Sequence, residues 1–350
     1  MNALTLYAGA EALARIRRDG FDPELFSHVG AAAGGPKWLV LSRLDRAVFG
    51  EWQAQRKTPL TAVGASIGAW RLACLAQRDP LAALSRFESA YLAQRYSERP
   101  DIAEVTAEAR RLLDVLLGDT GAAEIATNPL VALNIIVARR VHGRDGGWGE
   151  NAALARMVLA NALSRPALGG HLHRHVLHTG DAARYRDDGI PTGYAPLTGE
   201  AMAAVLMATA AIPGVIAPVH DLPGLPAGAY YDGGLIDYHM DLPLAERQGL
   251  MLLPHFSERV VTGWLDQFLP WRKPRHLDRT LLIVPSNDWI ARLPGGRIPS
   301  RRDFKRFHGR DAERIRTWQT ALSAGDWLAD EFRGLIASGR IIDAIQPLPR

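Results

Sequence analysis

The sequence predicts an α/β protein in which a parallel sheet carries helices on its faces. Three observations predict this class. The first 80 residues alternate short apolar runs, typical of buried strands, with segments whose apolar side chains recur at helical spacing. Glycines follow the apolar runs where each strand would give way to a helix. The chain has 350 residues, 47% hydrophobic and 22% charged, which is enough for a large globular core.

The N-terminal part is expected to contain a first helix followed by two strand–helix units. Residues 3–18 carry apolar side chains at helical spacing and predict the first helix. The runs 26–33 and 58–63 predict strands. Pro36 lies where a helix can begin, because its missing N–H needs no partner there, and another helix is expected after residue 66. Such alternation favours parallel strands joined by helical connections.

The rest of the chain continues with longer helices and further strands. Helical periodicity is found within 80–118, 151–163 and 198–211, and from about 301 to the end. Gly325 is expected to interrupt the last of these helices. Apolar or alternating runs predict strands at 130–141, 171–178, 230–231, 251–256 and 281–284. No internal repeat or low-complexity linker is present, so a single domain is the simpler expectation.

The composition excludes several classes of protein. With Cys74 as its one cysteine, the chain can form neither an internal disulfide nor a multi-cysteine zinc site. The N-terminus lacks the basic start and apolar core of a signal peptide, and no run of about 18 apolar residues could span a membrane. A net charge of +4 is too small and too dispersed to predict a nucleic-acid partner. We therefore expect a cytoplasmic protein, with peripheral membrane contact at most.

A Gly-x-Ser-x-Gly pentapeptide, GASIG at 64–68, lies where an expected strand gives way to a helix. A serine on such a sharp turn is held exposed at the positive end of the helix, and flanking glycines let the backbone pass close without Cβ clashes. Ser66 is therefore a candidate nucleophile. The alternative is a structural turn serine, because a chain rich in glycine can contain one such pentapeptide by chance.

Two further glycine-containing turns strengthen the first interpretation. The segment GAAAGGPK at 30–37 places glycines at the start of a helix, where free backbone N–H groups can hold an anion or the oxyanion of a tetrahedral intermediate. Asp232-Gly233-Gly234 follows an apolar strand, where a carboxylate can act as a base toward a serine hydroxyl. For each turn taken alone, a purely structural role is the favoured interpretation.

Together, the three motifs resemble those of the patatin-like phospholipase family, the lipid acyl hydrolases that use a Ser-Asp dyad in place of a triad. The order matches: a glycine-rich turn, then Gly-x-Ser-x-Gly, then a late Asp-Gly-Gly. The segment ATAAIP at 208–213, with Pro218 beyond it, is similar to the small-residue helix and proline segment that precedes the aspartate in that family. The resemblance covers residues 25–245, and residues 246–350 carry no motif of this kind.

The resemblance implies a three-layer α/β/α fold with a mostly parallel central sheet. It implies one patatin-like domain over residues 1–350. Residues 25–245 would form the catalytic core, and residues 246–350 a helical C-terminal extension of the same domain.

The roles that the resemblance implies fall on five residues. Ser66 would be the nucleophile and Asp232 its base. The N–H groups of Gly34 and Gly35 would form the oxyanion hole, and Lys37 could meet a lipid phosphate. The implied reaction is hydrolysis of a carboxylic ester of a lipid through an acyl-enzyme, as in a phospholipase A or a lipase. A dyad with backbone donors completes this chemistry, so no metal and no organic cofactor are expected.

The chain departs from the family pattern at several positions. The glycine triplet is Ala33-Gly34-Gly35 here, and Trp38 stands where a glycine usually follows the basic residue. Tyr238 and Met240 stand about where an asparagine and a proline commonly follow Asp-Gly-Gly. These departures bear on acyl-chain and head-group preference and leave both dyad residues in place.

An α/β-hydrolase esterase with a Ser-His-Asp triad is an alternative, since it also carries Gly-x-Ser-x-Gly. Its serine usually lies deeper in the chain, and its histidine should lie late, where His255 and His308 are candidates by position. A separate run, HLHRHVLH at 171–178, places alternate histidines on one face of an expected strand, as a metal site would need. No carboxylate partner stands at a fixed short spacing, so surface histidines are the favoured interpretation.

The C-terminal region combines basic and aromatic residues. Its members are Trp264, Phe268, Trp271, Arg272, Lys273 and Arg275, followed by Arg297, Arg301, Arg302, Phe304, Lys305, Arg306 and Phe307. Such a surface could dock on anionic lipid, with the tryptophans at the interface. Docking would suit a lipase and would equally suit a non-catalytic membrane-surface binding protein, the second alternative. A solvated helix face is the structural explanation, and no feature indicates an oligomeric state.

Overall fold

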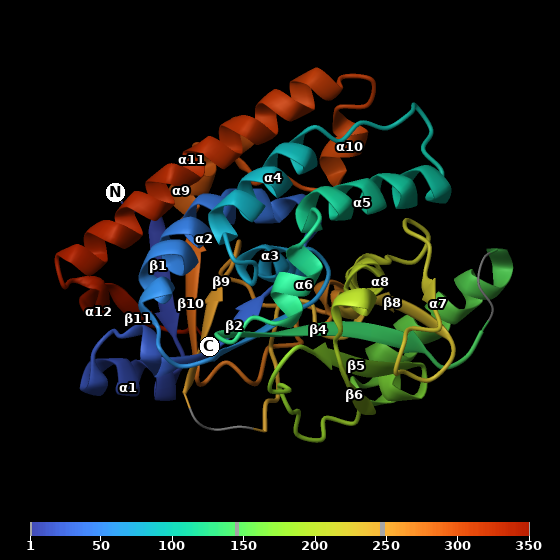
Figure 1. Ribbon diagram of the computed structural model, residues 1–350, viewed down its shortest axis with the longest axis horizontal. Helices are drawn as coiled ribbons and strands as arrows, with labels where there is room; N and C mark the ends of the chain where they lie inside the picture. Colours follow the sequence, from blue (N-terminus) through green and yellow to red (C-terminus); the bar gives the residue numbers. More distant parts are fainter. Residues whose placement is uncertain (1, 144–146, 246–248, 350) are drawn as a thin grey trace.

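The centre of the molecule is a single sheet of 11 strands (Figure 1). The computed structural model describes residues 2–143, 147–245 and 249–349. The strands are β1 (Leu4–Ala8), β2 (Phe26–Ala31), β3 (Leu60–Gly64), β4 (Val131–Arg140), β5 (Leu172–His178), β6 (Thr192–Pro196), β7 (Val219–His220), β8 (Ala229–Asp232), β9 (Leu250–Pro254), β10 (Thr280–Pro285) and β11 (Ile345–Pro347). The central strands are buried, largely apolar runs, which is typical of a sheet covered on both faces.

The sheet is parallel in its middle and mixed at its edges. The strand order is β11-β1-β10-β9-β2-β3-β4-β5-β6, with β8 paired to β4 and β7. The run from β10 through β9, β2 and β3 to β4 is parallel throughout. Antiparallel pairs flank it, β1 with β10 on one side and β4 with β5 and β8 on the other. The predicted α/β class with a mostly parallel central sheet flanked by helices is confirmed.

The connections between strands are mostly helical. The α-helices are α1 (Ala10–Asp19), α2 (Ser42–Asp45), α3 (Ile67–Leu75), α4 (Pro80–Leu92), α5 (Ile102–Leu117), α6 (Gly121–Ala126), α7 (Gly147–Leu163), α8 (Gly199–Ala210), α9 (Asn287–Ala291), α10 (Arg302–Arg306), α11 (Asp311–Ala337) and α12 (Ile341–Ala344). Short 3-10 segments are η1 (Pro23–Leu25), η2 (Gly35–Leu41), η4 (Gln53–Gln55), η5 (Pro166–Gly170), η6 (Gly233–Leu235), η7 (Trp264–Phe268) and η8 (Pro294–Gly296), and η3 (Arg46–Trp52) is a π-helix. Side chains of Asp79, Asp101 and Thr198 cap α4, α5 and α8 by accepting backbone hydrogen bonds.

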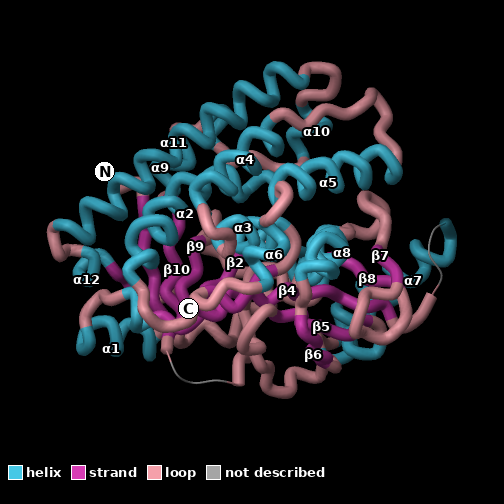
Figure 2. The backbone as a smooth tube through the Cα atoms, in the orientation of Figure 1, coloured by secondary structure: helices cyan, strands magenta, loops and turns pink. Residues whose placement is uncertain are grey.

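The two faces of the sheet are covered differently. In Figures 1 and 2, helices α2, α3, α4, α5 and α11 lie together above the strands. Apolar side chains of α3, α4, α5 and α8 form one buried cluster with β2, β3 and β4, and those of α1 and α11 form another with β1, β9 and β10. On the opposite face, α7 packs against β4 and β5, and loop residues such as Leu242 and Val260 pack against β9 and β10.

Two expectations about the helices are wrong in detail. The pattern over 3–18 predicts one helix, but its first part forms β1 and the helix begins only at Ala10. The strand forms because β1 pairs with β10 on one side and β11 on the other, and this tertiary pairing overrides the local periodicity. Gly325 does not interrupt α11. A Cβ there would lie 3.0 Å from the carbonyl oxygen of Val40, so the glycine lets α11 approach η2 closely.

Residues 246–350 supply more than the expected helical extension. Strands β9 and β10 lie inside the sheet between β1 and β2, and β11 forms its edge. Helix α11 from the same segment packs against α2 and η2. The expected boundary at 245/246 adjoins 246–248, which lie outside the described residues. The parallel middle of the sheet is therefore built from both the motif-bearing segment and the residues that follow it.

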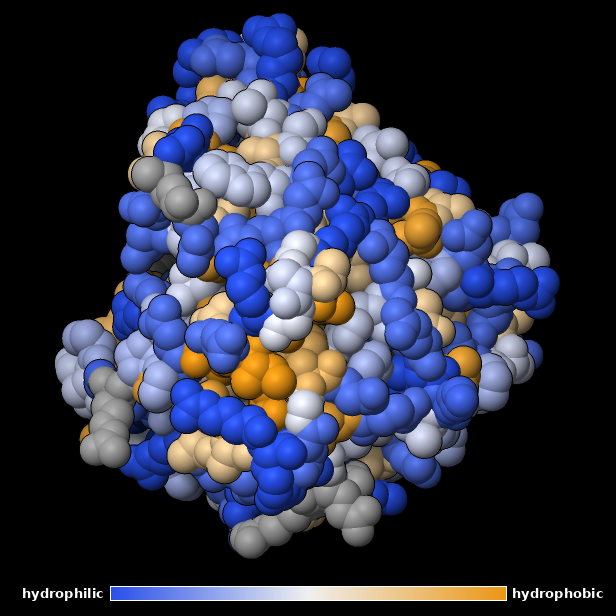
Figure 3. Space-filling view, turned by 90° about the vertical axis from the view of Figure 1, so that its left-hand side faces the viewer, coloured by the Kyte–Doolittle hydropathy of each residue, from blue (hydrophilic) through white to orange (hydrophobic). Residues whose placement is uncertain are grey.

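The surface near α1 and α12, at the left of Figure 1, is mostly hydrophilic around one apolar area near its centre (Figure 3). The 27 residues of α11 are enough to cross a bilayer in length, but charged side chains occur in both halves of the helix. Across residues 2–143, 147–245 and 249–349, no helix combines the length and the apolar character that a membrane span requires.

Candidate active site

Ser66 occupies a sharp turn between β3 and α3. The strand ends at Gly64 and the helix begins at Ile67, as the pentapeptide predicts. Ser66 itself has φ 54° and ψ −136°, and such a backbone costs a non-glycine residue about 1–3 kcal/mol. The residue is 2% exposed. A strained, buried serine at this position is typical of a nucleophile held at the end of a parallel strand.

Two hydrogen bonds hold this turn in place. The backbone N–H of Ser66 donates to Thr209 Oγ1 at 2.9 Å, and that hydroxyl donates to the carbonyl oxygen of Ile136 at 2.6 Å. Thr209 lies in α8 and Ile136 in β4, so the turn is fixed by two elements far from it in sequence. The motif at 208–213 predicts a small-residue helix but no role for Thr209. Its similarity to the family segment before the aspartate was the one available signal.

Strand β4 brings Asp232 next to Ser66. It pairs with β3 at Ile135 and with the last residue of β8, Asp232, at Val137. Ser66 Oγ donates to Asp232 Oδ2 at 2.6 Å, across 166 residues of sequence. The other carboxylate oxygen, Oδ1, accepts the N–H of Gly234 at 2.7 Å. The structure thus brings together the two residues that the motifs proposed as a pair.

The environment of Asp232 changes its acidity. Burial raises the pKa of this carboxyl from 3.8 to about 6. The hydrogen bonds from Ser66 and Gly234 and the positive charge of Arg301 act in the opposite direction on the same pKa. A carboxylate whose pKa lies near neutrality can take a proton in one step and return it in the next.

The glycines beside Ser66 have no room for a side chain. A Cβ on Gly68 would lie 2.0 Å from the carbonyl oxygen of Ala31, at the end of β2. A Cβ on Gly64 would lie 2.8 Å from the backbone nitrogen of Ala69. Helix α3 therefore begins in direct contact with the end of β2, and this contact places Ser66 beside the glycine-rich turn that follows β2.

We expect Gly68→Ala to lower the free energy of unfolding by about 2–4 kcal/mol, because the new methyl group overlaps the backbone of β2. Gly334→Ala in α11 is the matched control. A Cβ there meets nothing within 4 Å, so the change should stabilise the protein by up to about 1 kcal/mol, as alanine does in an open helical position. Chemical denaturation of the parent and both variants measures the two effects. Parent-like stability of Gly68→Ala would contradict the close approach.

The glycine-rich turn lies next to the dyad. Gly35 has φ 56°, a region that favours glycine, and it lines the same pocket as Ser66. A Cβ on Gly34 would lie 2.8 Å from the ring of Phe256. The N–H groups of both glycines stand at the beginning of η2, where the helix itself offers no acceptor. Lys37 follows the same turn but does not line this pocket, and its Nζ lies 4.6 Å from the centre of the Phe256 ring.

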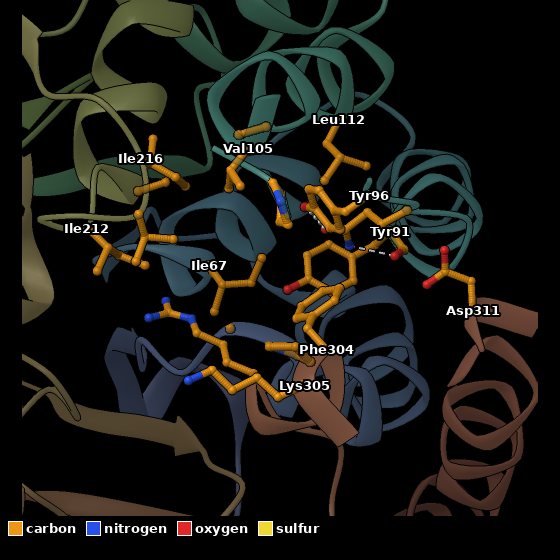
Figure 4. A pocket seen from close by; sticks show the side chains of 18 of the residues that line it. Ile67, Tyr91, Tyr96, Val105, Leu112, Ile212, Ile216, Phe304, Lys305 and Asp311 are labelled. Atoms are coloured by element: carbon orange, nitrogen blue, oxygen red, sulfur yellow. Dashed lines mark hydrogen bonds between the residues drawn. The ribbon is translucent and has the colours of Figure 1, made fainter. Parts of the chain in front are cut away.

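An apolar pocket of about 620 Å³ opens beside Ser66 (Figure 4). Its apolar walls include Ile67, Trp70, Tyr91, Tyr96, Val105, Leu112, Ile212, Ile216 and Phe304. In Figure 4, Ile212 and Ile216 lie on one side of the pocket and Tyr91 and Tyr96 on the other. A pocket of this size and lining can hold an acyl chain away from water.

Basic side chains of the C-terminal region reach the same pocket. Arg301 and Lys305 line it together with Ser66. Arg301 also lines a smaller cavity of about 20 Å³ beside Asp232. Its side chain lies against Gly35, since a Cβ there would be 2.9 Å from Arg301 Nε. The basic and aromatic pattern of this region predicts a surface cluster and not this position, because spacing along the chain does not show which side chains face a distant site.

Two residues that depart from the family pattern, Trp38 and Tyr238, contact elements that form the site. Trp38 is buried, and its ring centre lies 4.7 Å from that of Phe87 and 5.5 Å from that of Tyr91. Tyr91 is a wall of the pocket, so Trp38 helps to position that wall. The carbonyl oxygen of Tyr238 accepts the N–H of Ala33 at 2.9 Å and so fixes the glycine-rich turn.

The histidines considered for a triad have other partners. His308 lines the pocket, but its Nε2 lies 2.6 Å from the carbonyl oxygen of Glu98. His255 is buried, with its Nδ1 next to the carbonyl oxygen of Ser257. Over the described part of the chain, neither histidine hydrogen-bonds to Ser66, whose hydroxyl donates to Asp232.

The histidine-rich run 171–178 is not simply a surface strand. His175 is 5% exposed, because β5 lies between β4 and β6, and burial lowers its pKa to about 4. Within the residues that the structure describes, no three His, Cys, Asp or Glu side chains gather in a way that could hold a metal ion.

The fold and the site together define an α/β protein with a serine at a strand-to-helix turn, a carboxylate bonded to that serine, and an adjoining apolar pocket. The family model described as Patatin-like phospholipase matches residues 26–240. The chain belongs to the patatin-like phospholipase family, and this membership supports lipid acyl hydrolase activity in general. No curated protein sequence matches the chain.

Proposed function

We propose that this chain hydrolyses carboxylic esters of lipids, with Ser66 as nucleophile and Asp232 as its base. The observation that carries the proposal is the 2.6 Å hydrogen bond from Ser66 Oγ to Asp232 Oδ2 beside an apolar pocket of about 620 Å³. The bond makes the carboxylate the immediate acceptor of the hydroxyl proton. The pocket gives the acyl chain of a lipid a place next to the reacting oxygen.

The first half of the reaction forms an acyl-enzyme. Ser66 Oγ attacks the ester carbonyl carbon while its proton passes to Asp232 Oδ2. The N–H groups of Gly34 and Gly35 are the proposed donors to the resulting oxyanion. The carbon–oxygen bond to the alcohol then breaks, and the proton held by Asp232 moves to the departing oxygen.

The second half returns the enzyme to its starting state. A water molecule gives a proton to Asp232 and attacks the acyl carbon. The bond between that carbon and Ser66 Oγ breaks, and the serine oxygen recovers the proton from Asp232. A fatty acid leaves, and each proton taken by the carboxylate has been returned.

Labelling with a fluorophosphonate probe, followed by mass spectrometry of the adduct, tests the proposal directly. We expect an adduct on Ser66 that is lost in an Asp232→Asn protein, because the probe reacts with an activated serine hydroxyl. The labelling is repeated with lipid vesicles, which could expose a covered site. Folded protein without an adduct under both conditions would contradict the proposed nucleophile.

We expect ester hydrolysis to rise with pH through about 6 and to level off above it. Below this pH the carboxyl of Asp232 is protonated and cannot accept the serine proton, and above it the base is ionised. The dependence of kcat/KM on pH for a neutral, soluble ester measures the transition. A rate that stays constant down to about pH 4.5 would show that the base titrates with an ordinary carboxyl pKa.

Peripheral membrane contact remains part of the proposal. Phe268 and Trp271 are 68% and 69% exposed, and the exposed Lys273 and Arg275 follow them in the chain. Arg272 between them forms an ion pair with the buried Asp266 at 2.8 Å and is not part of this surface. Exposed aromatic side chains beside cations suit the interface of an anionic membrane. Such contact would bring the pocket to lipids in an aggregate.

A further inference from the structure

Two cations at the pocket lie beyond the family match, which ends at residue 240. Arg301 immediately precedes α10 and Lys305 lies within it, and both are exposed and line the pocket with Ser66. Figure 4 shows the amino group of Lys305 on the same side of the pocket as Ile67. The family motifs therefore account for the nucleophile and base but not for the charge at this pocket.

Two basic residues of this region, Arg297 and Arg310, have carboxylate partners. Arg297 lies 3.5 Å from Asp303, and Arg310 lies 2.9 Å from Glu313. In contrast, no carboxylate among residues 2–143, 147–245 and 249–349 forms an ion pair with the side chain of Arg301. An arginine without such a partner at the edge of an apolar pocket retains its donors for an anionic ligand.

The carboxylates that also line the pocket do not neutralise this side of it. Asp311 forms an ion pair with Arg314 at 3.2 Å, and Figure 4 shows it across the pocket from Lys305. Glu98 is the other lining carboxylate, and among the described residues its side chain forms no ion pair with Arg301 or Lys305. The positive charge next to Ser66 thus comes from Arg301 and Lys305.

Arg301 lies close to both dyad residues and to the glycine-rich turn. It lines both the pocket that contains Ser66 and the small cavity that contains Asp232, and it lies against Gly35. When the carbonyl of an ester substrate lies at Ser66, the alcohol part of that ester lies near the guanidinium of Arg301. The apolar walls take the acyl chain, so the cations face the part of the substrate that departs.

We propose that Arg301 and Lys305 bind an anionic oxygen group, a phosphate or a carboxylate, carried close to the scissile ester of the substrate. The site then prefers anionic ester lipids to neutral ones. This inference rests on the proposed function and adds its substrate class. A guanidinium binds such groups through two parallel hydrogen bonds, and a nearby ammonium adds a second charge.

The test compares Arg301→Gln with Arg302→Gln, the adjacent exposed arginine that is the matched control. The substrates are a phosphatidic acid and the diacylglycerol with the same acyl chains, both in micelles of a zwitterionic detergent. Assays are run at about pH 8, so that Asp232 is ionised in every protein. For Arg301→Gln, the ratio of kcat/KM for the phosphate lipid to that for the neutral lipid should fall about tenfold or more, mainly through KM. Arg302→Gln should keep the parent ratio, and Arg301→Lys should recover part of it.

Inorganic phosphate identifies the source of the anion. If inorganic phosphate inhibits hydrolysis of the neutral lipid by the parent but not by Arg301→Gln, free phosphate also occupies this subsite. A lipid preference without such inhibition would assign the lipid head group alone. Either result supports the anion subsite.

Three results would overturn the inference. They are an unchanged substrate ratio in Arg301→Gln, an equal loss on both lipids, and an equal change of the ratio in Arg302→Gln. An equal loss would place Arg301 at the oxyanion or at Asp232 rather than at a substrate anion. Failure of the proposed function is recognised separately, since the parent would then hydrolyse neither lipid and Ser66 would not react with the fluorophosphonate probe.

Discussion

Ser66→Ala is expected to abolish ester hydrolysis, with kcat/KM reduced about ten-thousand-fold or more. The hydroxyl that it removes is the one that donates to Asp232 at 2.6 Å. The backbone N–H of residue 66 keeps its bond to Thr209, so the turn retains its main support. Steady-state hydrolysis of a neutral, soluble ester measures the loss, and thermal unfolding checks that the variant is folded.

Ser89→Ala provides the matched control for this change. Ser89 lies in α4, where its hydroxyl donates to the carbonyl oxygen of Ser85 at 3.0 Å within the same helix. Its loss should change activity by less than about twofold, as for most exposed positions. Activity in Ser66→Ala close to that of Ser89→Ala would exclude Ser66 as the nucleophile.

Asp232→Asn is the second change with a large expected effect, a reduction of kcat/KM by about a thousand-fold or more. The asparagine carbonyl oxygen can still accept the N–H of Gly234, but its side chain cannot take a proton from Ser66. The rise of activity with pH near 6 should disappear together with the rate. The pH profile of residual hydrolysis and the probe labelling of Ser66 measure both consequences.

Asp221→Asn is the control with the same chemical change. Asp221 is exposed. Like Asp232, it accepts a hydrogen bond from the backbone N–H of a glycine that follows it in the chain, in this case Gly228 at 2.8 Å. Its activity should stay within about twofold of the parent. His308→Ala separates the dyad from a triad, because a histidine variant as inactive as Asp232→Asn would support the Ser-His-Asp alternative.

Local patterns predicted most of the elements that carry the site. Strand β3, the turn at Ser66 and helix α3 follow from an apolar run, two glycines and a helical repeat within a few residues of each other. Strand β1 was missed because its apolar spacing also fits a helix, and its pairing with β10 involves residues far along the chain. The predicted break at Gly325 is wrong because the reason for a glycine there, the close approach of Val40, lies on another element.

The sequence by itself determined the family motifs, the candidate pair Ser66 and Asp232, and the α/β class, because each depends on residue types at short spacing. Only the tertiary structure decided that pairing with β4 brings Ser66 Oγ to 2.6 Å from Asp232 Oδ2, across 166 residues of sequence. It also decided that Arg301 lies at the pocket while Lys37 lies over Phe256. These placements depend on which strands pair and which helices pack together, and distant contacts of that kind leave no periodic signal in the chain.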